Sequence, residues 1–182
     1  MLSPGRILLL AFLVAALGAF LAMRLWTMPL IRAGAGGRDM FDLLIDGYSP
    51  AYVADYLAAL GDDARTLYLG PQRLLDTILP VALTGTLATA TYLMARRWSL
   101  VLGLALALVP LFYFAFDMLE NAQLAVILTH RAASAEMAEA ASRFTMAKAQ
   151  ALRFAIGAVT FVGLARAAEA LLTRAEAGET GQ

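Results

Sequence analysis

The sequence has no cysteine, and His130 is the single histidine among its 182 residues. Without cysteine the chain cannot form disulfide bonds, thiolate metal sites or iron–sulfur clusters. One histidine also excludes a bis-histidine haem and an H-E-x-x-H zinc site within a single chain. We therefore predict no cofactor and assign no metal site from the sequence.

Charge is scarce as well. Asp, Glu, Lys and Arg make up 15% of the chain, compared with about 25% in ordinary soluble domains. The 14 acidic and 14 basic residues cancel, and no run of basic residues is longer than the pair Arg96 and Arg97. Because this pattern lacks the positive patch that nucleic-acid binding requires, we expect no nucleic-acid partner.

Apolar residues dominate the rest of the sequence. They form 61% of the chain, and the mean hydropathy is +0.71, which excludes an ordinary soluble domain and a disordered chain. A membrane-spanning helix needs about 20 mostly apolar residues. Four stretches meet that length: residues 7–30, 74–95, 100–119 and 151–172. The sequence therefore predicts an all-α fold, an integral membrane four-helix bundle.

The first and the fourth stretch each leave an alternative open. Residues 1–6 and the apolar run after them resemble a signal peptide, but the run exceeds the usual limit of about 15 residues and lacks a good A-x-A-like cleavage site, which favours an uncleaved span. Arg153 and Arg166 bracket the fourth stretch. It either spans, with both arginines reaching the interface, or packs along the other helices. Residues 1–174 are predicted to form one transmembrane domain, followed by a polar tail at 175–182.

The basic residues indicate an orientation. Residues 96–99, the shortest predicted connection, carry two arginines and no acidic residue. The positive-inside rule places this connection in the cytoplasm. Arg6 and Arg174 near the two ends agree with it. We therefore predict a multi-pass protein of the bacterial inner membrane with both termini in the cytoplasm.

The first long connection, residues 38–70, is predicted to hold short amphipathic helices over the outer mouth of the bundle. Ser49 before Pro50 is an N-cap and first-turn signature, and Gly61 is a suitable stop. Between them, apolar residues recur at helical spacing: Val53, Tyr56, Leu57 and Leu60. This spacing predicts one amphipathic helix directly after Ser49.

Further helices are expected on either side of this one. Residues 39–46 are long enough for two turns, and residues 64–69 for a short helix that Gly70 and Pro71 would end. The second long connection, residues 131–150, is rich in alanine. We expect it to be helical and to run into the fourth span.

A few polar residues stand at the ends of the predicted spans. Asp117, Glu120 and Asn121 have i, i+3 and i+4 spacing, so they share one helix face at the end of the third span. Asp76 begins the second span, and a short turn between the two spans brings both of these ends to the outer side. Pro80 lies four residues after Asp76 and leaves the Asp76 carbonyl without its helical partner.

Arg65, Arg73 and Tyr68 are expected at the same level as these acidic residues. Three carboxylates and an amide offer the oxygen ligands that hard cations prefer. Neighbouring like charges instead raise one carboxyl pKa, which suits proton transfer. A third interpretation is purely structural: Arg73 or Arg24 pairs with an acidic residue of the third span, while the Asn121 side chain bonds to backbone.

Several short motifs between residues 47 and 125 resemble a pattern found in a family of bacterial four-helix membrane proteins. They are G-Y-S-P at residues 47–50, Y-L-x-x-L-G at 56–61, Arg65, Tyr68, L-D-x-x-x-P at 75–80 and D-x-x-E-N at 117–121. No activity is established for that family. The resemblance therefore implies a four-helix membrane architecture and marks these residues as candidates for a shared role. It does not imply a reaction.

Three classes of function remain open at this point. The leading hypothesis is a non-catalytic protein that binds membrane lipid, a small apolar ligand, a partner membrane protein or a second copy of itself. The aromatic patch of Phe112, Tyr113, Phe114 and Phe116 either faces lipid or receives an apolar ligand. The alternative is a membrane-embedded enzyme acting on lipid at the outer interface, with Asp117 or Glu120 as general base. A transporter or channel subunit is the third.

Overall fold

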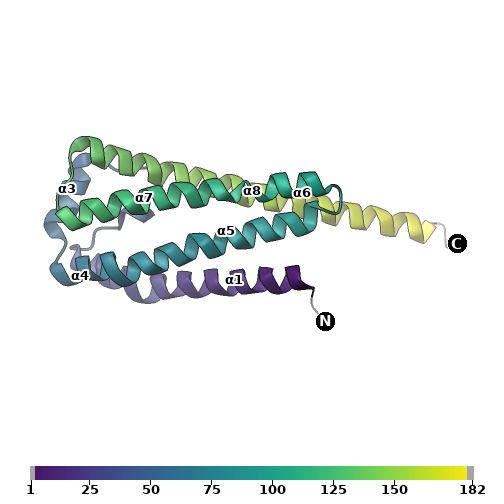
Figure 1. Ribbon diagram of the computed structural model, residues 1–182, viewed down its shortest axis with the longest axis horizontal. Helices are drawn as coiled ribbons and strands as arrows, with labels where there is room; N and C mark the ends of the chain where they lie inside the picture. Colours follow the sequence, from purple (N-terminus) through teal and green to yellow (C-terminus); the bar gives the residue numbers. More distant parts are fainter. Residues whose placement is uncertain (1–2, 180–182) are drawn as a thin grey trace.

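A computed structural model describes residues 3–179, and every regular element within that range is helical. Four long helical segments lie side by side in Figure 1. Their bounds are Pro4–Gly34, Asp62–Ala95, Leu100–His130 and Ala135–Ala175, and each is long and apolar enough to cross a membrane. The prediction of an all-α bundle with four such helices is confirmed.

The first long segment is not a single regular helix. It consists of α1 (Pro4–Ala22), a π-helical turn (Met23–Thr27) and α2 (Met28–Gly34). Pro29 has no backbone N–H and cannot bond to the carbonyl four residues before it, so a widened turn next to the proline keeps the helix continuous. The segment contains the predicted span at residues 7–30 and extends beyond both of its ends.

The second long segment corrects one prediction. Gly70 and Pro71 do not end a short helix. Instead, α4 (Asp62–Leu67) passes through a π-helical turn (Tyr68–Gln72) into α5 (Arg73–Ala95). The wider turn accommodates the missing N–H of Pro71, as it does near Pro29. The expected loop helix and the second span are therefore one continuous segment.

The third segment also extends further than its predicted end at residue 119. It consists of α6 (Leu100–Ala107) and α7 (Pro110–His130), with the break falling where Pro110 cannot continue the bonding pattern. α7 continues because Leu124, Ile127 and Leu128 are buried in the hydrophobic core. It ends at Arg131, whose φ of 52° is left-handed. Helical structure therefore resumes only at residue 135, four residues later than the predicted start at 131.

The last helix, α8 (Ala135–Glu179), joins the alanine-rich connection to the fourth predicted span in one element, as expected. Its backbone stays helical past residue 175, where the polar tail was predicted to begin. Residues 180–182 of that tail lie outside the described residues. α8 packs mainly on α7, and α1 packs mainly on α5.

The loop between the first two segments contains a 3₁₀ turn (Phe41–Leu43) and α3 (Pro50–Ala59). The Ser49 hydroxyl accepts a hydrogen bond from the Tyr52 backbone N–H at 3.2 Å, so the predicted N-cap is confirmed. The two turns expected at residues 39–46 reduce to the single 3₁₀ turn. Gly47 follows with a φ of +95°, and an added Cβ would lie 3.1 Å from Ser142 and Met146 side chains. Only glycine fits this close approach to α8.

The bundle has two unlike ends (Figure 1). The start of α1, the α5–α6 turn and the far part of α8 lie at one end, here named the termini end. The loop end carries α3, α4 and the α7–α8 turn. There, residues 35–60 cover the helices and bury the aromatic side chains of Phe41 and Tyr56, whose ring centroids are 4.6 Å apart. We call this covering segment the loop cap.

Burial is distributed very differently along the rest of the bundle. Large apolar side chains point outward there, with exposed fractions of 75% at Leu25, 76% at Val101 and 73% at Phe154. Many buried positions between the helices are small residues, such as Ala16, Ala19 and Ala82. The loop end thus has an ordinary hydrophobic core, whereas the remainder presents an apolar surface.

Candidate functional site

Lys148 on α8 is the centre of a buried charged cluster at the loop end. Its ammonium lies 3.2 Å from an Asp117 carboxylate oxygen and in direct contact with the Glu120 carboxylate, both on α7. Asp42 of the loop cap approaches the same ammonium to 4.0 Å. We call these four residues the Lys148 cluster. One side chain thereby links two helices and the loop cap.

The carboxylates of the cluster are shielded from solvent. The exposed fraction is 3% for the Asp117 side chain and 0% for that of Glu120, and 10% for Lys148. Burying a charged group is costly unless an opposite charge and hydrogen bonds compensate it. Lys148 supplies that opposite charge to Asp117 and Glu120 together.

Asn121 connects the cluster to α5. Its side-chain amide donates to the Asp117 carboxylate at 3.0 Å and to the Asp76 backbone carbonyl at 3.1 Å. Pro80 frees that carbonyl from the helical pattern, as the sequence indicates, and Asn121 uses it. The structure therefore brings Asp117, Glu120 and Asn121 together with the buried Asp76. The backbone contact of Asn121 is the one that the structural interpretation expected.

Hydroxyl groups complete the surroundings of the cluster. Thr145, one turn before Lys148, donates to Glu120 and lies 3.4 Å from the Tyr48 hydroxyl. Tyr68, a predicted site residue, donates to Asp42 at 3.3 Å. The Tyr48 backbone N–H donates to Ser142 on α8 at 2.9 Å. These contacts attach the loop cap to α8 and to the π-helical turn before α5.

The predicted arginines lie elsewhere. Arg65 donates to the Leu128 and Thr129 carbonyls at 3.2 and 3.4 Å, near the C-terminus of α7, where free carbonyls and the helix dipole favour a cation. Arg73 is exposed on α5. Neither forms an ion pair with Asp117 or Glu120, and nor does Arg24. Lys148 takes the role expected of an arginine.

Lys148, Thr145 and Asp42 were not predicted as site residues. Lys148 falls in the alanine-rich stretch that was interpreted only as a helical connection. The position of Lys148 opposite α7 follows from the register of a hairpin. α7 and α8 are antiparallel, and the turn between them falls at residues 131–134. Residues at similar sequence distances from that turn face each other, which brings Glu120 opposite Thr145 and Asp117 opposite Lys148.

A metal centre gains no support from this arrangement. Within residues 3–179, no group of three or more histidine, aspartate or glutamate side chains is placed so as to hold a metal ion. The space between the Asp117 and Glu120 carboxylates is occupied by the Lys148 ammonium. The lysine thus stands where the hard-cation interpretation would put a cation.

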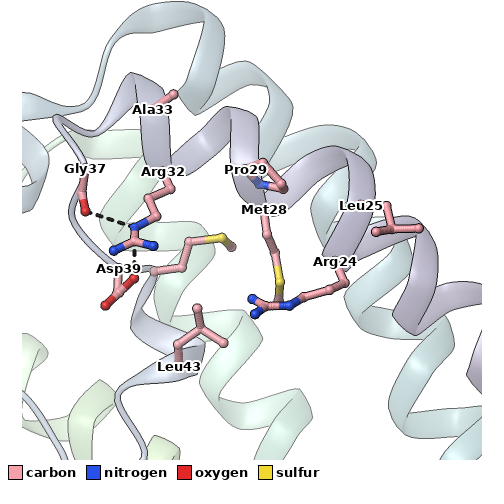
Figure 2. A pocket seen from close by; sticks show the side chains of 10 residues that line it. Arg24, Leu25, Met28, Pro29, Arg32, Ala33, Gly37, Asp39 and Leu43 are labelled. Atoms are coloured by element: carbon pink, nitrogen blue, oxygen red, sulfur yellow. Dashed lines mark hydrogen bonds and ion pairs between the residues drawn. The ribbon is translucent and has the colours of Figure 1, made fainter.

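A pocket of about 630 Å³ lies beside the loop cap (Figure 2). Arg24 and Arg32 line it together with apolar side chains, among them Met28 and Leu43. Arg32 donates to the Gly37 carbonyl at 3.0 Å and pairs with Asp39 at 3.2 Å, whereas Arg24 extends along Met28 in Figure 2. The pocket lies between the first long segment and the loop cap, and none of the four residues of the Lys148 cluster lines it.

Comparison with known proteins gives no relative: no family model, curated protein or solved structure matches the chain. The resemblance carried by D-x-x-E-N therefore stays a prediction.

Proposed function

We propose that the chain crosses the bacterial inner membrane four times. On the first two long segments, charged residues bound uncharged stretches of suitable length. The uncharged stretch between Arg6 and Arg24 corresponds to about 27 Å of helix, and that between Asp76 and Arg96 to about 30 Å. Both lengths fit the hydrocarbon thickness of about 30 Å. The outward-facing apolar side chains of these stretches would then contact lipid.

We propose that the termini end faces the cytoplasm. Arg6, Arg96, Arg97 and Arg166 gather at this end, as the lining of one pocket. An excess of arginine and lysine close to span ends favours the cytoplasmic side. The loop cap and the Lys148 cluster would accordingly lie at the outer interface.

We propose that the protein binds membrane lipid or another apolar ligand and has no catalytic role. The observation that carries this proposal is an open apolar groove of about 570 Å³ between α7 and α8. Phe112, Phe116 and Phe154 line it, together with Ala147 and Ala151. Phe112 and Phe154 are 63% and 73% exposed. The groove lies on the membrane side of Asp117 and Lys148, where a lipid chain can enter from the bilayer.

The Lys148 cluster has a supporting role in this proposal. A general base has to come within hydrogen-bond distance of its substrate. Asp117 and Glu120 are instead enclosed and in contact with Lys148. This geometry favours a cluster that fixes α7, α8 and the loop cap over one that abstracts a proton from a lipid substrate.

Native mass spectrometry of the protein in lipid nanodiscs tests the groove. We expect the wild type to retain phospholipid after mild activation, and Ala147→Trp to retain less of it because the indole fills the groove. Ala167→Trp, at an exposed position on α8 away from the groove, is the matched control and should retain lipid like the wild type. A wild type without lipid, or an Ala147→Trp variant that retains as much as the control, would contradict the proposal.

A further inference from the structure

A second pocket, at the termini end, gathers four arginines from three parts of the chain. It has a volume of about 620 Å³ and lies between α1, α5 and α8. Arg6 comes from α1, Arg96 and Arg97 from the α5–α6 turn, and Arg166 from α8. Folding therefore brings together cations that are far apart in the sequence.

Most of this positive charge is not neutralised by the protein. Arg166 pairs with Glu169, and Arg96 lies over the Tyr92 ring at 5.3 Å from its centroid. Arg6 and Arg97 form no ion pair within the part of the chain that the structure describes. The pocket therefore has an excess of about three positive charges, which attracts a ligand of negative charge.

The wall of the pocket changes from charged to apolar along the bundle axis. Leu9 follows Arg6 by one turn on α1, deeper in the bundle. On α5, Ala90, Leu93 and Met94 precede Arg97 at helical spacing and share its face. A ligand that fills this pocket needs an anionic group at the arginines and an apolar part beside these side chains.

We propose that this pocket binds an anionic phospholipid. Its phosphate would lie against Arg6, Arg96 and Arg97, whose guanidinium groups match phosphate in geometry and charge. One acyl chain would follow Leu9 and Leu93 into the bilayer. Basic pockets between membrane helices on the cytoplasmic side hold anionic head groups in this way. A zwitterionic head group suits the pocket less, because its own cation would face unpaired arginines.

This inference rests on the proposed membrane insertion, but it goes beyond the proposed function by naming a second site and a head-group charge. The positive-inside rule accounts for basic residues near span ends in general. The rule does not explain why arginines from α1, the α5–α6 turn and α8 line one pocket that also has an apolar wall. Two features support an anionic phospholipid as the ligand: the excess positive charge of the pocket, and apolar side chains that extend from the arginines along the bundle axis.

The test measures the head groups that remain bound in nanodiscs made from equal amounts of phosphatidylcholine and phosphatidylglycerol. We expect the wild type to retain more phosphatidylglycerol than phosphatidylcholine, with a preference on the order of tenfold for the lipid bound in this pocket. The double variant Arg6→Gln, Arg97→Gln should lose this preference. Arg73→Gln, which removes an exposed arginine at the loop end, is the matched control and should keep it.

A third variant separates lipid binding from membrane orientation, because removing two arginines also weakens the topology signal. Ala90→Phe narrows the apolar wall and leaves all four arginines in place, so it should lose the preference with unchanged orientation. Retained lipid without head-group preference in the wild type would overturn this inference and leave the proposed function intact. Retention of no lipid at all would overturn both. An unchanged preference in both test variants would also overturn the inference.

Discussion

The ammonium of Lys148 on α8 lies 3.2 Å from a carboxylate oxygen of Asp117 on α7, inside the loop end of the bundle. The same ammonium contacts Glu120 and approaches Asp42 of the loop cap. A single cation therefore compensates carboxylates from two separate parts of the chain. Because uncompensated buried charge is costly, we expect the fold of the loop end to depend on this lysine.

Arg65 should stabilise α7 by donating hydrogen bonds to backbone carbonyls at the C-terminus of that helix. We expect Arg65→Met to lower the free energy of unfolding by about 1–3 kcal/mol, because the Leu128 and Thr129 carbonyls lose a charged donor. Arg73→Gln removes an exposed arginine on the same long segment and should leave stability unchanged. Thermal unfolding followed by circular dichroism compares the two variants. Equal effects in both would refute the capping role of Arg65.

Two tyrosines of α3 should respond differently to loss of the hydroxyl. The Tyr52 hydroxyl donates to the Asp39 carbonyl at 2.6 Å. The Tyr56 hydroxyl is buried and has no hydrogen-bond partner among residues 3–179. We expect Tyr56→Phe to be neutral or stabilising, and Tyr52→Phe to destabilise the loop cap by about 1 kcal/mol. Hydrogen exchange of α3 amides measures this local difference. A greater loss of protection in Tyr56→Phe than in Tyr52→Phe would contradict the stabilising role of the Tyr52 hydroxyl.

The loop cap should be sensitive to alkaline pH. Burial raises the pKa of both Tyr48 and Tyr56 well above the ordinary tyrosine value. Because the phenols ionise more readily in the unfolded chain, stability is constant below the unfolded pKa of about 10 and falls as the pH rises above it. Tyrosinate absorbance should therefore show these two residues ionising only when the loop cap unfolds. Their ionisation at pH 10 with α3 still protected would contradict this.

Elements with local signals could be predicted from the sequence. The long apolar stretches indicate the four helices that are long and apolar enough to cross a membrane, and Ser49 before Pro50 indicates the start of α3. The spacing of Asp117, Glu120 and Asn121 places them on one face of α7. In each case the sequence pattern lies within the predicted element or a few residues from it.

Features that depend on contacts between distant segments could not be predicted in this way. Gly70 and Pro71 carry local stop signals, but a π-helical turn and packing against neighbouring helices keep the segment continuous. α7 passes residue 119 because the loop cap buries its last apolar residues. Lys148 has no local signal at all. Its role appears only once the register of the α7–α8 hairpin is known.

Labelling of single cysteines should establish the orientation, and the natural lack of cysteine leaves no background. Ser99→Cys lies at the α5–α6 turn of the termini end, and Asp63→Cys is exposed at the loop end. With an impermeant maleimide on intact cells whose outer membrane is permeable to it, we expect Asp63→Cys to react. Ser99→Cys should react only after the inner membrane is opened. The opposite pattern would invert the proposed topology.

The Lys148 cluster holds the loop end together, and the free energy of unfolding of its variants is the decisive test of this role. Lys148→Met should lower the free energy of unfolding by about 3–5 kcal/mol, because it leaves buried carboxylates without a cation. The triple variant Lys148→Met, Asp117→Asn, Glu120→Gln should recover much of this loss, since the stranded charges are gone. Thermal and denaturant unfolding in the same nanodiscs gives both values. If Lys148→Met matches the wild type, or if neutralising the carboxylates recovers nothing, the cluster does not hold the loop end together.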